Sequence, residues 1–211
     1  MKTSLVFSFF LFGIGGYVSV AMAQSAGTFT ATGNMTTGRI GHTATLLLDG
    51  KVLIAGGSQG GDGSTYSIAA STEIYDPATG TVAPTGDLTR ARVGHSATPL
   101  PDGRVLIAGG YGRLGSTKSG GCPLQSSCGQ LTSAEIYDPS SGTFTVTGDM
   151  TAPGGAAVLL LNGNVFISSG NSFPYVTVAQ AELYDPSRGT FSATSAVFWI
   201  SELLPSISAR R

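Results

Sequence analysis

The sequence predicts an all-β protein of the β-propeller type, and two repeated motifs carry this prediction. Tyr-Asp-Pro recurs at spacings of 62 and 47 residues, starting at Tyr75, Tyr137 and Tyr184. Gly-Thr followed by Phe or Val recurs at spacings of 53, 62 and 47 residues, starting at Gly27, Gly80, Gly142 and Gly189. Each repeat holds four short segments suited to strands, with turn residues between them. Repeats of about 50 residues with four strands each are typical of propeller blades.

The first 23 residues have the pattern of a secretory signal peptide. A basic Lys2 is followed by an apolar stretch at 5–20 and by a small-x-small triplet at 21–23, after which Gln24 would begin the mature protein. An uncleaved membrane anchor is the alternative, but the apolar stretch is short and three glycines interrupt it. We therefore expect a secreted or periplasmic protein with no membrane contact after cleavage.

Four strands are expected in each complete repeat. In the first repeat, strands at 42–48 and 51–55 flank Asp49-Gly50, a pair that favours a two-residue hairpin turn of type I′. The same signal recurs at Asp102-Gly103 and Asn162-Gly163. The third and fourth strands are joined by Asp-Pro-x-x-Gly, a turn with proline-set φ and a glycine exit, at 76–80, 138–142 and 185–189.

These strands divide the chain into segments. The segments are a signal peptide at 1–23, an orphan fourth strand at 24–36, blade 1 at 37–87, blade 2 at 88–149, blade 3 at 150–195 and a non-repeat tail at 196–211. Blade 3 is degenerate, because it reads Ala-Pro-Gly-Gly at 152–155 where blades 1 and 2 have Arg-x-Gly-His. Propellers close with about four to eight blades. We therefore expect an open arc that is marginally stable and self-associates through its open blade faces, or else is a truncated piece of a longer propeller.

The repeated residues resemble those of kelch-repeat proteins over residues 27–194. The matching segments of blade 1, which blade 2 repeats, are Arg-Ile-Gly-His at 39–42, Ile-Ala-Gly-Gly at 54–57 and Glu-Ile-Tyr-Asp at 73–76. The resemblance implies propeller blades in which these residues support the fold. The positions expected to be structural are Arg39, His42, Gly56, Gly57, Glu73, Tyr75, Asp76, Arg92, His95, Gly109, Gly110, Glu135, Tyr137, Asp138, Glu182, Tyr184 and Asp185.

One face of the arc is the better candidate for ligand binding. Strand direction alternates within a blade, so the loops between second and third strands (the 2–3 loops) share a face with the links between blades. These loops vary in length, and function usually lies on variable loops held by a rigid scaffold. In proteins that this chain resembles, the same face often binds the ligand. The candidate binding residues on it are Tyr66, Arg90, Tyr111, Arg113, Lys118, Phe173 and Tyr175.

The sequence indicates no catalytic, metal or cofactor site. Most acidic residues recur once per repeat, which suggests hydrogen bonding within the fold rather than acid–base work. His42 and His95 hold the same position in adjacent blades, and a metal would need further ligands, while the sequence has no third histidine. Galactose oxidase is a secreted copper enzyme on a kelch-type propeller, but its set of two Tyr and two His has no matching motif here.

Two cysteines lie in the longest 2–3 loop. Cys122 and Cys128 have five residues between them. In an exported chain this spacing favours a disulfide, whose main effect would be to fix the shape of the loop.

The charge balance narrows the class of partner. The formal net charge is −1, only 11% of residues are charged, and no Lys/Arg run occurs, which argues against nucleic acid or an anionic membrane as partner. We expect a binding module for a protein or carbohydrate ligand, not an enzyme. Two alternatives are a fragment of a galactose-oxidase-like enzyme whose catalytic blades are absent, and a purely structural surface repeat.

Overall fold

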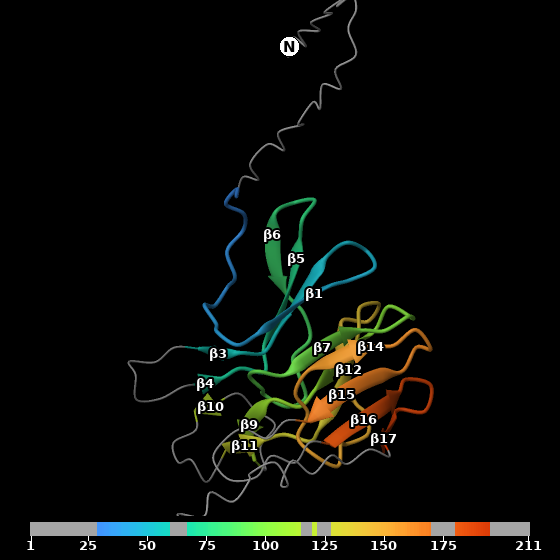
Figure 1. The fold of residues 1–211 in the computed structure, drawn as a ribbon. Helices are drawn as coiled ribbons and strands as arrows, with labels where there is room; N and C mark the ends of the chain where they lie inside the picture. The colour runs from blue at the N-terminus through green and yellow to red at the C-terminus, as the bar shows by residue number, and fades with distance from the viewer. Residues whose placement is uncertain (1–28, 60–66, 115–119, 122–127, 170–179, 195–211) are drawn as a thin grey trace, which may run out of the picture. The chain divides into compact units, whose positions relative to one another are not determined.

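The computed structural model describes residues 29–59, 67–114, 120–121, 128–169 and 180–194. The chain divides into a short unit, Met1–Ala31, and a larger one, Thr32–Arg211, which holds all the strands. Every regular element in the described residues is a β-strand, which confirms the all-β class (Figure 1). The predicted signal peptide and the tail at 196–211 lie outside the described residues. Within the described part, no helix has the length and apolar character needed to cross a membrane.

Three four-stranded antiparallel sheets form the blades of a β-propeller-like fold, and none of them closes on itself. Blade 1 consists of β1 (Thr43–Leu46), β2 (Val52–Ala55), β5 (Thr72–Asp76) and β6 (Thr81–Pro84). Blade 2 consists of β7 (Ser96–Pro99), β8 (Val105–Ala108), β12 (Ala134–Asp138) and β13 (Thr143–Val146). Blade 3 consists of β14 (Ala157–Leu159), β15 (Val165–Ser169), β16 (Gln180–Asp185) and β17 (Thr190–Ala193). Within each blade the four strands pair in chain order, as predicted.

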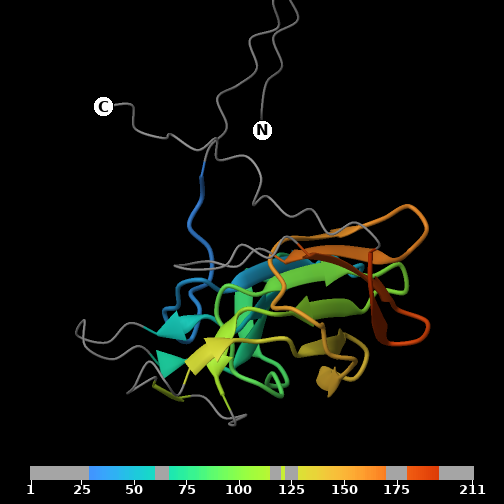
Figure 2. The same ribbon diagram turned by 60° about the horizontal axis from the view of Figure 1, so that its bottom comes forward.

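Blade 2 packs between blades 1 and 3. The first strands lie side by side, β1 against β7 and β7 against β14 (Figure 2). Val105 and Ile107 of β8 pack in one apolar cluster with Leu53 of blade 1, whereas Leu106 and Ala108 pack in a second cluster with residues of blade 3. All four residues of β8 are buried. This explains why β8 is apolar throughout, since a strand covered on both faces does not alternate.

The 2–3 loops carry short strands of their own. In blade 1 these are β3 (Ser58–Gln59) and β4 (Ser67–Ile68), and in blade 2 they are β9 (Tyr111–Arg113), β10 (Gly120–Gly121) and β11 (Cys128–Gln130). β9 pairs with β11, while β10 pairs with β4. The long loop of blade 2 therefore adds a strand to the loop of blade 1.

The hairpin turns differ from the predicted type. In blade 1 the Gly50 amide donates to the Leu47 carbonyl at 3.0 Å, and the Leu47 amide donates to the Lys51 carbonyl at 2.8 Å, which defines a three-residue loop. Gly50 has a φ of +83°. This is the pattern of a type I turn followed by a glycine bulge. The prediction of a two-residue loop was wrong because Asp-Gly favours positive φ at the glycine but does not determine the length of the loop. In blade 2, a type I turn also suits Pro101, which is its second residue.

Successive blades are held together by a repeated contact, which we call the Thr–Gly joint. A threonine and a glycine that follow the fourth strand of one blade bind the tyrosine and the last glycine of the next blade's Tyr-Asp-Pro-x-x-Gly turn. Thr85 Oγ1 lies 3.0 Å from the Tyr137 hydroxyl, and the Gly86 amide donates to the Gly142 carbonyl at 3.0 Å. The same contacts join Thr147-Gly148 to Tyr184 and Gly189, and Thr32-Gly33 to Tyr75 and Gly80.

Residues 32–36 therefore hold, against blade 1, the position that the end of one blade holds against the next. The Thr36 amide donates to Glu73 at 3.0 Å, as the Thr89 amide donates to Glu135 at 2.6 Å. Residues 29–36, the described part of the predicted orphan strand, form no strand. A fourth strand is defined by its pairing with a third, and no strand among the described residues pairs with this segment.

Candidate functional site

A two-stranded ribbon formed by β9 and β11 carries two of the predicted binding residues, Tyr111 and Arg113. Its register pairs Tyr111 with Gln130, Gly112 with Gly129 and Arg113 with Cys128. Side chains alternate along a strand, so Tyr111 and Arg113 share one face of the ribbon. We call this pair of strands the β9–β11 ribbon.

Gly112 lets the opposite face of the ribbon lie close to the blade. A Cβ atom at Gly112 would lie 2.5 Å from the Ala91 carbonyl oxygen and 2.8 Å from Leu131 Cδ1. A side chain at this position would have no room. The close contact on this face holds the ribbon against the blade, so Tyr111 and Arg113 point away from it.

The first of two hollows beside the ribbon, called the Tyr111 hollow, has a volume of about 380 Å³. It lies where blades 2 and 3 meet, and the Tyr111 side chain at its rim is 39% exposed. Its wall offers a phenol, an amide, backbone groups and the apolar surfaces of valine and proline. The residues that line it are Val93, Gly94, Gly110, Tyr111, Gln130, Pro153, Gly154 and Gly155.

The degenerate motif of blade 3 supplies Pro153, Gly154 and Gly155 to the wall of this hollow. Where blades 1 and 2 meet, the His95 side chain lies between the blades, with Nε2 2.9 Å from Thr43 Oγ1. Blade 3 has Gly155 at the position of His95, so no imidazole fills the space. The hydroxyl of Ser96, which corresponds to Thr43, donates instead to the Ala108 carbonyl of its own blade at 3.3 Å. The junction of blades 2 and 3 therefore lacks the contact between a ring and a hydroxyl that joins blades 1 and 2.

The second hollow, called the Arg90 hollow, has a volume of about 290 Å³ and also borders the ribbon, through Gln130 of β11. Arg90, Asp149 and the buried Arg92 are the charged residues that line it, while Leu114, which is 50% exposed, adds apolar surface. Gln130 of β11 lines both hollows. The ribbon and the two hollows therefore form a continuous candidate binding surface.

The buried charged residues near this surface are paired with other groups of the fold. Arg92 Nη2 lies 2.8 Å from Glu135 Oε1, and Arg92 Nη1 donates to the carbonyls of Gly109 and Ser133 at 2.8 and 2.9 Å. Burial lowers the pKa of Arg92, which attraction to Glu135 partly offsets. Burial, with repulsion from Arg92 and His42, also lowers the pKa of His95 to about 3, so its imidazole is neutral near pH 7.

The other residues predicted to be structural lie at corresponding places in each blade. Arg39 Nη2 lies 3.7 Å from Glu73 Oε1 in blade 1, whereas Glu182 of blade 3 has Ala152 where an arginine would stand. Glu182 accepts instead from the amides of Thr151 and Ala152 at 2.9 and 3.0 Å. Gly56, Gly57, Gly109 and Gly110 all have positive φ. The third strands β5, β12 and β16 end on Tyr75-Asp76, Tyr137-Asp138 and Tyr184-Asp185.

The structure brings together the predicted binding residues that it describes. Tyr111 and Arg113 lie on the ribbon and Arg90 lines the adjacent hollow. Four others, Tyr66, Lys118, Phe173 and Tyr175, lie outside the described residues. Cys122 also lies outside them, so its disulfide with Cys128, a buried residue of β11, stays a prediction. Gln130, Asp149 and Leu114 were missed, because no local sequence pattern predicts that β11 pairs with β9.

No group of three His, Cys, Asp or Glu side chains that could hold a metal ion occurs among the described residues. The Nδ1 atoms of His42 and His95 are buried without a hydrogen-bond partner there. Two imidazoles alone are too few ligands for a structural or catalytic metal site, which has three or four protein ligands.

No protein-family model and no curated protein matches this sequence. Among solved structures, the chain is similar to a novel fungal alcohol oxidase of the AA5 family, in complex with copper, with a TM-score of 0.49 and 17% identity. The match covers 73% of this chain and 30% of the oxidase, so the chain spans less than a third of that protein. A likeness this distant carries no argument about activity.

Proposed function

We propose that this protein is a secreted kelch-type binding module that holds a polypeptide partner on the β9–β11 ribbon and its two hollows. The observation that carries the proposal is the Tyr111 hollow, where a part-exposed aromatic ring borders a cavity walled by glycine, proline and valine. Aromatic and arginine side chains supply most of the binding energy in protein interfaces. Tyr111, Arg113 and Arg90 place that chemistry on one surface.

The composition of the surface supports binding rather than catalysis. The wall of the Tyr111 hollow contains no carboxylate, imidazole, amine or thiol. General acid–base catalysis mostly uses such groups, and the Tyr111 phenol is the one titratable side chain on this wall. Asp149 lines the adjacent Arg90 hollow, while Glu135 is fully buried and bound to Arg92 and to the Thr89 amide.

The test uses peptides selected on the exported protein from a random phage-displayed library. We expect selected peptides to lose about tenfold in affinity for Tyr111→Ala, since one aromatic anchor is worth roughly 1–2 kcal/mol. Leu48→Ala is the matched control, because Leu48 is 82% exposed but lies on a hairpin turn away from the ribbon. Affinity for Leu48→Ala should equal that of the unaltered protein.

Three results would count against this function. Peptides that bind Tyr111→Ala as tightly as the unaltered protein would place the binding surface elsewhere. Ligands found on a glycan array, and lost with Tyr111→Ala, would replace the polypeptide with a carbohydrate at the same hollow. Copper-dependent oxidation of a primary alcohol by the purified protein would support the enzyme-fragment alternative.

A further inference from the structure

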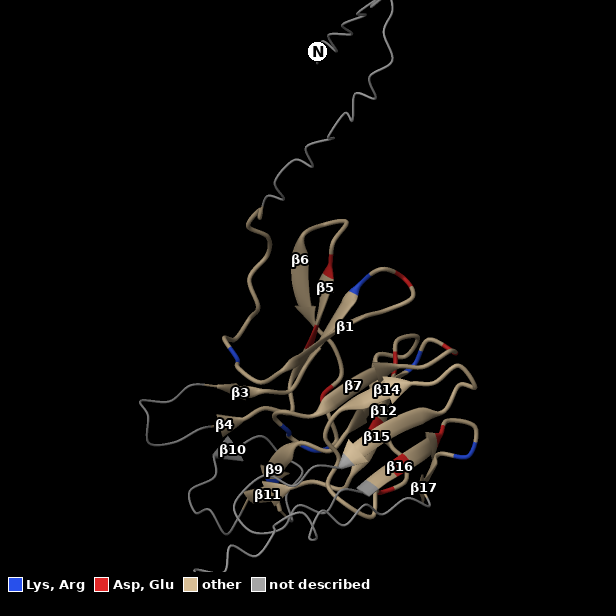
Figure 3. Ribbon diagram, viewed as in Figure 1, with Lys and Arg blue, Asp and Glu red and all other residues tan. Residues whose placement is uncertain are grey.

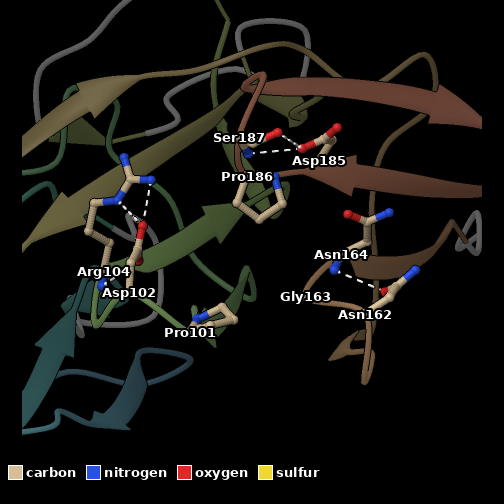
Figure 4. A pocket seen from close by; sticks show the side chains of 9 residues that line it. All are labelled: Pro101, Asp102, Arg104, Asn162, Gly163, Asn164, Asp185, Pro186 and Ser187. Carbon is tan, nitrogen blue, oxygen red and sulfur yellow. Dashed lines mark hydrogen bonds and ion pairs between the residues drawn. The ribbon is translucent and has the colours of Figure 1, made fainter.

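One groove has no part in the function proposed above. It is formed by the tight turns at the ends of the strands, whereas the ribbon belongs to a 2–3 loop at their other ends. It lies where blades 2 and 3 meet and has a volume of about 420 Å³. Asp102 and Arg104 stand on one side and Asn162 and Asn164 on the other, with Pro101 and Pro186 between them (Figure 4). We call it the asparagine groove. Charged residues are sparse along the strands and gather mainly at turns and links (Figure 3).

The charges of the asparagine groove neutralise one another. Asp102 lies 2.7 Å from Arg104 Nη2, and Asp185 lies 3.2 Å from Arg188 Nη1. Partial burial opposes ionisation of Asp102, but hydrogen bonds from Arg104 outweigh it and lower the pKa of this carboxyl. Hydrogen bonds from the hydroxyl and amide of Ser187 lower the pKa of Asp185. Both acids are therefore ionised and paired at neutral pH, and the groove has no net charge to offer an ionic ligand.

The amide groups are the polar atoms that remain available. Asn162 Oδ1 accepts from the Asn164 backbone amide at 3.1 Å, which leaves the Asn162 NH₂ group with no partner among the described residues. The Asn164 side chain has none there on either its oxygen or its nitrogen. An amide offers a donor and an acceptor side by side, which matches a pair of neighbouring hydroxyl groups. The rings of Pro101 and Pro186 add apolar surface between these polar edges.

The corresponding groove between blades 1 and 2 lacks this chemistry. It has Leu48 where the asparagine groove has Pro101, and Arg104 where the asparagine groove has Asn164. Its acidic turn residue, Asp138, accepts from Ser140 as Asp185 does from Ser187. Both grooves are formed by a hairpin turn and an Asp-Pro turn, so the asparagine pair and Pro101 are the features that distinguish the second.

We propose that the asparagine groove binds a neutral saccharide. The unpartnered amides of Asn162 and Asn164 bond its hydroxyl groups, and the prolines pack against its C–H surfaces. The proposal does not depend on the ribbon, because the groove is formed by the hairpin turns and the Asp-Pro turns alone. It assigns to the turn face a second ligand, different in class from the partner of the ribbon.

The test measures saturation-transfer NMR and calorimetric titration of the exported protein with maltotriose, cellotriose and mannotriose. We expect at least one of these neutral trisaccharides to bind, and its affinity to fall at least fivefold for Asn164→Leu, which removes the free amide. Asn164→Asp keeps the size of the side chain and replaces the NH₂ donor with a charge, so it should weaken binding as well. Asn162 is left intact because its side chain caps the hairpin turn.

Controls separate this proposal from the function of the ribbon. Leu48→Ala and Tyr111→Ala should both bind the trisaccharide with unchanged affinity, and the peptide ligands of the ribbon should bind Asn164→Leu normally. Failure of all three trisaccharides to bind would overturn the proposal. Equal binding by folded Asn164→Leu and Asn164→Asp, checked by unchanged melting temperature, would also overturn it. A loss with Leu48→Ala would place the saccharide in the groove between blades 1 and 2.

Discussion

The three buried glutamates show how one residue position can keep its structural role while its partner changes. Glu135 and Glu73 are paired with arginines of their own blades, at 2.8 and 3.7 Å. Glu182 has no arginine at the corresponding position and accepts instead from a further backbone amide, that of Ala152, at 3.0 Å. The Thr151 hydroxyl donates to Glu182 as the Thr36 hydroxyl donates to Glu73. All three also accept a backbone amide from the link that precedes the blade. A buried carboxylate needs compensating donors rather than a particular cation, and the link supplies them in each blade.

The buried His95 predicts a specific loss of stability in acid. Its pKa is about 3 in the folded protein and near 6.5 when unfolded, so the unfolded chain binds the proton more readily between these values. The free energy of unfolding should therefore fall as the pH drops from about 6.5 towards 3, by up to about 5 kcal/mol, and be independent of this group above pH 7. Urea unfolding across this pH range measures it.

The matched variant for this measurement is His95→Gln. Glutamine can still bond to Thr43 but does not titrate, while the carboxylates of the protein contribute equally to both proteins. Below pH 6.5 the unaltered protein should lose stability faster than the variant. Parallel curves for the two proteins would show that His95 is not the group responsible.

At the scale of the element, the β9–β11 ribbon depends on a close approach between its backbone and the blade. Gly112 lies on the face that contacts Ala91 and Leu131, while Gly129, its direct partner in β11, lies near Leu114. The two glycines are thus paired in the ribbon but surrounded differently. A methyl group added at Gly112 would meet the backbone of Ala91, whereas one added at Gly129 would meet the part-exposed side chain of Leu114. The two positions should therefore differ in how well they tolerate alanine.

We expect Gly112→Ala to destabilise the protein by about 1–3 kcal/mol and to weaken peptide binding at Tyr111, because the added Cβ lifts the ribbon from the blade. Gly129→Ala should change stability by less than about 0.5 kcal/mol, since its Cβ meets only Leu114 Cδ1 at 3.2 Å, and that side chain can move. Thermal melts and peptide titrations of both variants provide the comparison. Equal effects of the two substitutions would contradict the contact with Ala91.

The sequence correctly predicted the elements that are determined by short, local sequence motifs. The Asp-Pro-x-x-Gly turns and the glycines of the hairpins have short-range patterns, and strands in chain order follow from them. The β9–β11 ribbon could not be predicted in this way, because Tyr111 pairs with Gln130 across a long loop and β9 has no alternating pattern. Arg90, Tyr111 and Arg113 were predicted from residue type and loop position, whereas the hollows depend on how the ribbon and the blades pack together.

At the scale of the whole molecule, several apolar side chains are exposed, one of them at a position that is buried in the other two blades. Val158 of β14 is 54% exposed, whereas the corresponding residues Thr45 and Thr98 are each 5% exposed. Leu46 and Leu161 are also exposed, at 66% and 110%. Apolar residues gathered on strand and hairpin surfaces promote association between copies.

We therefore expect the mature protein to self-associate, with an average mass that rises with concentration in multi-angle light scattering. Val158→Thr, which restores the residue found in the other two blades, should reduce this rise without lowering the melting temperature. Lys51→Ala, a change at an exposed hairpin position, is the control and should associate like the unaltered protein. A constant monomer mass at all concentrations, together with a sharp melt, would show that no self-association occurs.

The Thr–Gly joint sets the boundaries at which blades could be exchanged between proteins of this design. Each blade is fastened by two residues that belong to the sequence before it, so the fastening of blade 2 lies at Thr85 and Gly86, after the last strand of blade 1. A graft cut at the edges of the sheet would leave blade 2 without its fastening. A segment that carries a complete blade 2 must begin at Thr85 and end at Val146. Its first residues therefore lie within the part of the sequence that was assigned to blade 1, at 37–87.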